Sequence, residues 1–131
     1  MKTFNVKTQK RQELIDITRQ VRDIVAKEGV EDGLCLVFVP HTTAGVTINE
    51  NADPSVRSDI IKGLEMVPEG GYDHSEGNSP AHIKASIVGS SVYIIIKDGE
   101  PKLGTWQGIY FAEFDGPRHR SVWVKTVNSR M

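Results

Sequence analysis

Two pairs of residues in the middle of the chain, Asp53-Pro54 and Ser79-Pro80, are strong signals for the start of a helix. In each pair a side chain that can cap a helix precedes a proline, which is well tolerated in the first helical turn. The first helix is expected to end before Pro68, and the second to end near Gly89. The apolar positions expected to face inward are Val56, Ile60, Ile61 and Leu64 in the first helix and Ile83 and Ile87 in the second.

Short stretches of alternating or continuous apolar residues make up most of the remaining chain, as is typical of strands. The first two are expected to pair with each other as a hairpin, and a helix capped by Thr18 and ended by Gly29 follows them. This order predicts a single α+β domain over residues 1–131, with a mixed or antiparallel sheet and helices packed against it. The predicted strands are Lys2–Thr8, Glu13–Ile17, Leu34–Val39, Val46–Asn51, Ser91–Lys97, Ile109–Phe114 and Ser121–Val127.

The balance of positive and negative side chains limits the kinds of partner that the chain is expected to bind. Sixteen Lys and Arg stand against seventeen Asp and Glu, giving a formal net charge of −1, which argues against a nucleic-acid binder because such proteins present a basic face. The single cysteine, Cys35, lies in an apolar run too short to cross a bilayer and is expected to be a buried, inert thiol. We expect no membrane segment and, without a hydrophobic N-terminal signal, a cytoplasmic location.

Three histidines form the first candidate site. His41 follows a predicted core strand, His74 lies in a glycine-rich loop, and His82 lies in the first turn of the helix that starts at Ser79. Three imidazoles with an open fourth position would suit a catalytic zinc or a similar ion. Their spacing matches no standard zinc motif, however, and each could equally be a structural residue with ordinary hydrogen-bond partners.

Polar residues elsewhere extend this candidate site. Glu50 ends a predicted strand and could act as a general base or support a histidine, whereas Asn51 could equally be a turn residue. Arg118 and Arg120 could hold an anion with their planar donors, or could pair with Glu113 in a salt bridge within a hairpin. Asp53 is sufficiently explained as a helix cap, and His119 is expected to be exposed.

Taken together, these segments resemble the YjbQ-like family, also called the secondary thiamine-phosphate synthase family. The resemblance extends over essentially the whole chain and rests on blocks in the same order. The blocks are His41-Thr42-Thr43-Ala44-Gly45, Asn49-Glu50-Asn51, His74, Gly77-Asn78, His82, Gly104-Thr105-Trp106-Gln107 and Glu113-Phe114-Asp115-Gly116-Pro117-Arg118-His119-Arg120.

The resemblance implies a small α+β fold, a homotrimer, and a metal or anion site at a subunit boundary. It implies His41, His74 and His82 as ligands of a divalent ion, with zinc or magnesium preferred. It also implies catalytic roles for Glu50 and Arg118 and substrate-binding roles for the residues Asn51, Asn78, Gln107 and Arg120.

The function expected from the resemblance is a metal-assisted enzyme acting on a small phosphorylated or anionic substrate. Its thiamine-phosphate-synthase-type transferase activity would be secondary, with arginine and metal stabilising the departing pyrophosphate. Trp106 could line the pocket for the substrate, although a core position is the simpler expectation. The alternative is a non-catalytic trimer in which the same residues hold a metal ion or an anion.

Overall fold

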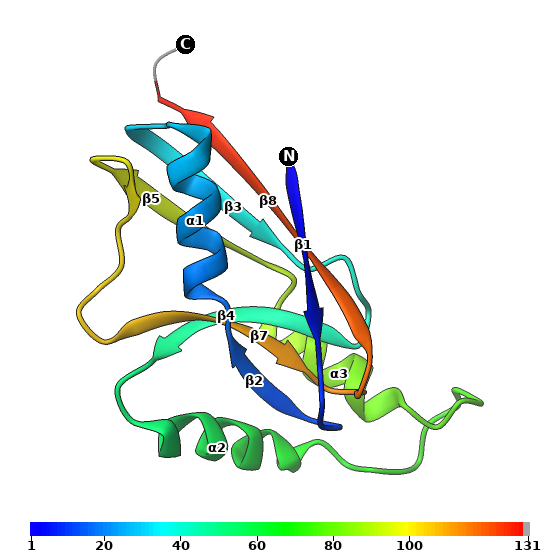
Figure 1. Ribbon diagram of the computed structural model, residues 1–131. Helices are drawn as coiled ribbons and strands as arrows, with labels where there is room; N and C mark the ends of the chain where they lie inside the picture. The colour runs from blue at the N-terminus through cyan, green and yellow to red at the C-terminus, as the bar shows by residue number, and fades with distance from the viewer. Residues whose placement is uncertain (130–131) are drawn as a thin grey trace.

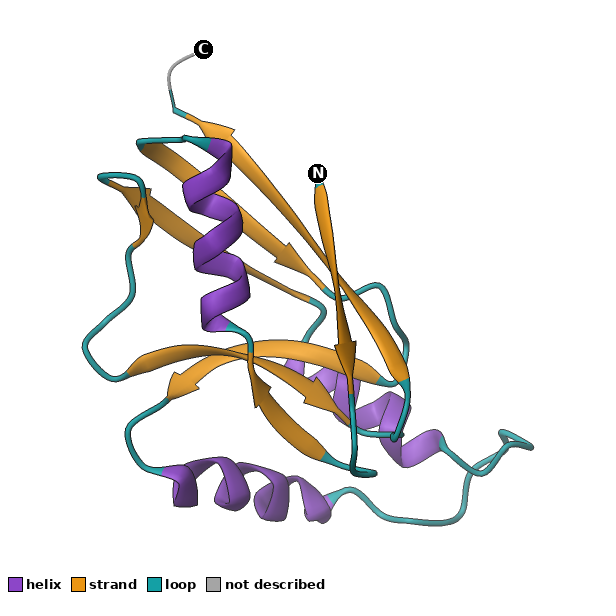
Figure 2. Ribbon diagram, in the orientation of Figure 1, coloured by secondary structure: helices purple, strands orange, loops and turns teal. Residues whose placement is uncertain are grey.

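The computed structural model describes residues 1–129 and consists of two antiparallel sheets with helices packed against them (Figures 1 and 2). The five-stranded sheet has the order β1-β8-β3-β5-β6, and the three-stranded sheet has the order β2-β7-β4. The strands are β1 (Lys2–Lys7), β2 (Glu13–Asp16), β3 (Asp32–Phe38), β4 (Ala44–Glu50), β5 (Ser91–Lys97), β6 (Glu100–Pro101), β7 (Gln107–Glu113) and β8 (His119–Asn128). The predicted α+β class is confirmed.

The helices begin and end close to where their capping signals predicted. Helix α1 spans Thr18–Glu28 and ends at Gly29 in the left-handed conformation, α2 spans Pro54–Gly63, and α3 spans Ser79–Val88. A short 3₁₀ turn, η1 (Leu64–Met66), extends α2. The Asp53 carboxylate accepts a hydrogen bond from the Ser55 amide at 2.9 Å, as a helix cap should.

Two of the predicted helix caps are wrong in detail. Thr18 is the first residue of α1, and its hydroxyl donates to Asp16 at 2.6 Å and accepts a hydrogen bond from the Ile109 amide. Helix α3 likewise has Asn78 at its cap position, without a side-chain capping bond. Thr18 therefore ties the helix start to β7 instead of satisfying an amide of its own helix.

The main core lies between the two sheets and α1. Val21 and Val25 of α1 pack there with Val37 of the five-stranded sheet and Phe111 of the three-stranded sheet, all fully buried. Cys35 lies in this core, as predicted, and burial raises the pKa of its thiol to about 11. An unreactive thiol is the consequence.

A second, smaller core lies on the opposite face of the three-stranded sheet, against α2 and α3. It contains Tyr110, Ala112 and Phe114 together with Ala81 and Ala85 of α3. The predicted inward face of α3 is wrong at Ile87, which is 53% exposed, and Lys84 is buried instead. The Lys84 ammonium is tolerated there because it donates to Gln12 Oε1 at 2.7 Å and lies 3.8 Å from the Glu65 carboxylate.

The predicted N-terminal hairpin is also wrong. Strand β1 pairs with β8 in one sheet, whereas β2 pairs with β7 in the other, so the chain changes sheets between Lys7 and Glu13. The reason is that the two strands contribute to different cores, since Val6 of β1 packs in the main core and Leu14 of β2 packs in the second one. Within residues 1–129, no helix is long and apolar enough to span a membrane.

Candidate functional site

The candidate site forms where three connections meet: the segment between β3 and β4, the loop that leads into α3, and the turn between β7 and β8. These connections enclose a hollow of about 420 Å³. Gly45 allows β4 to lie close to the end of α3, because a Cβ at that position would overlap the Gly89 carbonyl. The residues that line the hollow include His41, His74, Asn78, His82, Arg118 and Arg120.

The structure thus brings six of the nine predicted site residues to one hollow and leaves three elsewhere. Glu50 and Gln107 lie at the far ends of β4 and β7, because Ala44 pairs with Glu113 at the site end and Glu50 with Gln107 at the other. Six residues of extended strand place them roughly 20 Å away. Asn51 lies with them and donates to the Gln107 carbonyl at 3.2 Å.

His41 is held by a hydrogen bond from the protein backbone. The amide of Ser121 donates to His41 Nε2 at 2.9 Å, which occupies the lone pair of that nitrogen. Burial lowers the pKa of His41, and the charge of nearby Arg120 lowers it further. A neutral ring that accepts at Nε2 must carry its proton on Nδ1, and that donor has no partner among the described residues.

His74 and His82 lie against each other in the lining of the hollow. Their ring centroids are 5.4 Å apart, with one ring edge facing the other ring. His74 Nε2 is 3.8 Å from Glu76 Oε1, and both side chains are largely exposed. These two rings therefore form a polar wall open to solvent.

The two arginines in the lining are already paired with carboxylates. Arg118 donates through Nε to the Asp115 carbonyl at 2.8 Å and through Nη2 to the Asp115 carboxylate at 2.9 Å. Arg120 is 5% exposed and donates through both Nε and Nη2 to Glu113, which is fully buried. Each guanidinium therefore already has a carboxylate that balances its charge.

The pair of Glu113 and Arg120 is the centre of a wider network. Arg120 Nη2 also donates to Thr43 Oγ1 at 2.9 Å, and the Thr8 hydroxyl donates to Glu113 at 2.8 Å. The Thr8 hydroxyl in turn accepts a bond from the Arg118 amide at 2.8 Å. The sequence predicted Arg118 or Arg120 as a partner for Glu113. Nothing in the sequence indicated Thr8 or Thr43, which lie far from Glu113 along the chain.

Asn78 contributes an unusual acceptor. Its Nδ2 donates to Asp115 Oδ2 at 3.0 Å, which fixes the orientation of the amide, and its Oδ1 is buried without a partner among the described residues. A buried polar atom left unpaired is costly, and at a binding site it commonly meets a ligand or a water. Asn78 is thus a second residue of the lining with hydrogen-bonding capacity that no described residue uses.

The predicted three-histidine metal cluster is not formed in this arrangement. No group of three or more His, Cys, Asp or Glu side chains within residues 1–129 could hold a metal ion. His41 illustrates the reason, because coordination needs a ring nitrogen with a free lone pair and its Nε2 lone pair is engaged by Ser121. Trp106, expected in the core, is 63% exposed and lies outside the lining of the hollow.

The buried ion pair leads to a prediction about acid stability. Burial by itself raises the pKa of Glu113, but hydrogen bonds from Arg120, the Asp115 amide and Thr8 outweigh it and hold the pKa below its usual value. The carboxylate therefore stabilises the fold above the unfolded pKa of about 4.3, and this contribution is lost as the pH falls through the lower folded value. Glu113→Gln should lower the free energy of unfolding at pH 7 by roughly 3–5 kcal/mol, because it leaves Arg120 buried and unpaired.

Urea unfolding between pH 7 and pH 3 checks this expectation. The wild type should lose stability more steeply below about pH 4.3 than Glu113→Gln does. The matched control is Glu28→Gln, on the exposed surface of α1, which should follow the wild type at every pH. Equal acid slopes for wild type and Glu113→Gln would contradict the assigned role of the ion pair.

Comparison with known proteins identifies the relatives of the chain. The family model described as UPF0047 protein YjbQ-like matches residues 2–129. UPF0047 protein MJ1081 of Methanocaldococcus jannaschii is 56% identical over 129 residues, covering 97% of this chain and 94% of that protein. UPF0047 protein YugU of Bacillus subtilis is 49% identical over 128 residues, covering 95% and 97%.

Solved structures agree with the fold. A crystal structure of an uncharacterized conserved protein of the YjbQ/UPF0047 family from Clostridium acetobutylicum superposes with a TM-score of 0.95 at 56% identity, covering 97% of this chain and 100% of that one. A YbjQ-like protein of unknown function from Sulfolobus solfataricus gives 0.93 at 34% identity, covering 98% and 96%.

These findings correct the expected function. The names of the relatives give no catalytic activity, and the side chains of this chain do not form the metal site on which the expected reaction depends. The prediction of a metal-assisted transferase of the thiamine-phosphate-synthase type is therefore wrong, as is its alternative of a trimer holding a metal ion or an anion at these residues. The match over nearly the whole chain establishes that this protein belongs to the UPF0047 family of YjbQ-like proteins.

Proposed function

We propose that the hollow around His41 binds a small uncharged polar molecule through hydrogen bonds from the protein's own side chains. The observation that supports this most directly is the hydrogen bond from Ser121 to His41 Nε2, which leaves the Nδ1 proton without a partner among the described residues. A fixed donor at the wall of a hollow of about 420 Å³ is what a binding site for a small molecule requires.

The ligand should carry a hydrogen-bond acceptor next to a donor. His41 Nδ1 can donate to a carbonyl oxygen, and the unpaired Oδ1 of Asn78 can accept from an N–H or O–H group. A primary carboxamide has both groups on one carbon. The ligand class proposed is therefore small molecules with an amide or a similar carbonyl and N–H pair.

Charge argues for a neutral ligand. Asp115 neutralises Arg118 and Glu113 neutralises Arg120, so the remaining formal charge in the lining is the Glu76 carboxylate. An anion entering the hollow would have to lose water without gaining an unpaired cation in return. A neutral amide avoids that cost.

Titration of the ¹⁵N-labelled protein with nicotinamide, with EDTA present throughout, tests the proposal by NMR. Saturable shifts are expected at the amides of Asn78, His82 and Ser121. Nicotinate has the same ring but a carboxylate in place of the amide, and it should bind more weakly. His41→Ala should weaken nicotinamide binding roughly three- to tenfold, as expected for one lost hydrogen bond.

The control for that variant is His119→Ala, which removes an exposed imidazole from β8 outside the hollow and should leave the affinity unchanged. Equal binding by wild type and His41→Ala would contradict the proposal. So would binding that appears only when EDTA is replaced by zinc or magnesium.

We also propose that the protein is a homotrimer that assembles through the outer face of its five-stranded sheet. On that face Leu34 lies opposite both Ile95 of β5 and Val127 of β8. These residues are 46%, 60% and 49% exposed, and Tyr93 nearby is 69% exposed. A continuous apolar surface of this kind commonly marks a protein interface, while the number of subunits follows from the family resemblance.

Light scattering coupled to size-exclusion chromatography measures the assembly. The wild type should give about three times the mass of a chain of 14.5 kDa, and Ile95→Lys should give a smaller mass. Ile87→Lys, at an exposed position of α3 outside this face, should leave the mass unchanged. A monomeric wild type would overturn the proposal.

A cytoplasmic location stays a prediction.

A further inference from the structure

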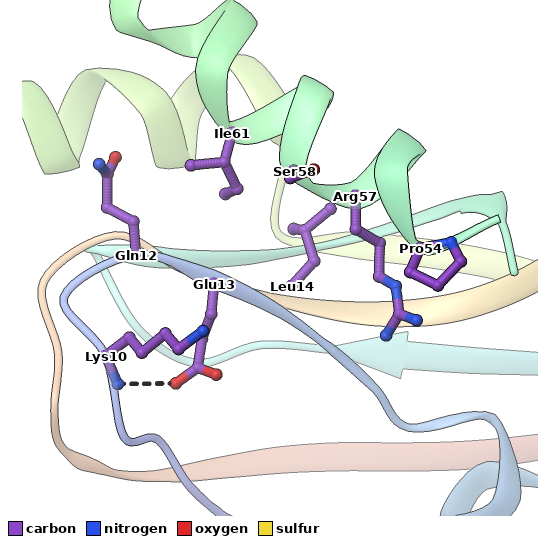
Figure 3. Close-up of a pocket in the computed structure, with 8 residues that line it drawn as sticks. All are labelled: Lys10, Gln12, Glu13, Leu14, Pro54, Arg57, Ser58 and Ile61. Carbon is purple, nitrogen blue, oxygen red and sulfur yellow. Dashed lines mark hydrogen bonds between the residues drawn. The ribbon is translucent and has the colours of Figure 1, made fainter.

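A second hollow, of about 400 Å³, lies between α2 and β2 and shares no residue with the hollow around His41. Figure 3 shows Leu14 and Glu13 on the β2 side, with Arg57 and Ile61 extending from α2 toward them. Lys10 lies at the end of this hollow, in the turn before β2. It is thus a separate candidate site on another part of the small sheet.

Arg57 is a half-buried cation without a counterion. No hydrogen bond or ion pair in the described part of the chain involves its guanidinium, whose carbon lies 5.4 Å from the centroid of the Tyr110 ring. The ring face attracts the positive charge but accepts none of the five N–H donors in the usual way. Arg57 therefore has donors to offer to a ligand in the hollow.

Tyr110, directly beneath Arg57, has a buried hydroxyl that lacks a partner. The residue is fully buried, and its Oη finds no hydrogen bond among the described residues. Tyr110 is not among the residues that line the hollow, so its ring supports Arg57 from beneath and its hydroxyl does not reach a ligand there. Burial raises the pKa of Tyr110, so the phenol adds no charge beside the guanidinium.

The lining of the hollow indicates the class of ligand. Lys10 and Arg57 contribute two positive charges and Glu13 one negative, which leaves one net positive charge. Glu13 Oε2 is already engaged, since it accepts from the Gln9 and Lys10 amides at 2.7 and 2.9 Å. The remaining walls include the apolar side chains of Leu14, Pro54 and Ile61.

We propose that this hollow binds a small monocarboxylate with an apolar stem, whose carboxylate pairs with Arg57. The planar guanidinium matches a carboxylate in shape. A single negative charge balances the lining, whereas a doubly charged phosphate would face Glu13 with excess charge. The stem would replace water along Leu14 and Ile61.

Butyrate is the probe for this site, added to the ¹⁵N-labelled full chain and followed by NMR. Saturable shifts are expected at Leu14, Arg57 and Ser58. Butyramide keeps the stem but lacks the charge, and it should bind at least roughly tenfold more weakly, because hydrogen bonds to charged groups are stronger than neutral ones. Inorganic phosphate should also bind more weakly.

Two variants separate the contribution of Arg57 from that of the ring beneath it. Tyr110→Phe removes an oxygen that lies outside the lining of the hollow, so butyrate affinity should stay unchanged. Arg57→Gln should weaken binding at least roughly tenfold. The matched control, Arg22→Gln on the exposed surface of α1, should bind as the wild type does.

Several outcomes would overturn the proposal: no saturable shifts with butyrate, equal binding of butyramide or phosphate, or unchanged affinity in Arg57→Gln. His41→Ala should leave butyrate binding intact. Failure here is therefore distinguishable from failure of the site around His41, because the two hollows have different probes and different variants.

Discussion

The buried ion pair between Glu113 and Arg120 is the interaction on which the histidine hollow depends. It joins the end of β7 in one sheet to the start of β8 in the other, and its hydrogen bonds to Thr43 and Thr8 bring two further connections to the same place. Because a single buried charge is strongly unfavourable, both partners must meet whenever the sheets pack. Ser121, next to Arg120, is thereby placed with its amide facing His41.

Local signals in the sequence predicted most elements, whereas long-range pairing could not be predicted. The Asp53 cap and the glycine at position 29 act within one helical turn, so their effect is visible in the sequence. The partner of β1 lies more than 110 residues away in β8, and no local pattern distinguishes it from the neighbouring β2. The same limit applies to Lys84. Its ammonium donates a hydrogen bond to Gln12, which directly precedes β2 and lies 72 residues away along the chain.

The candidate site shows a similar division. Residues in three separate blocks meet at one hollow, but Glu50 and Gln107, which belong to the same set by resemblance, lie at the other end of their strands. The chemistry expected of these residues from the sequence also differs from the chemistry that their positions in the structure support. Histidines and arginines suggest metal and anion binding in a sequence, but here His41 accepts a backbone hydrogen bond and both arginines have carboxylate partners. Free donors and acceptors, more than formal charges, characterise this hollow, whereas an unpaired Arg57 characterises the second one.

The central claim is that Ser121 holds His41 as a neutral ring with its proton on Nδ1. Two-dimensional NMR that correlates the ring nitrogens of His41 with its ring protons measures this tautomer directly. At pH 7 we predict a bare, pyridine-like signal for Nε2 and a protonated, pyrrole-like signal for Nδ1, unchanged by EDTA. A proton on Nε2, or on both nitrogens, would contradict the account.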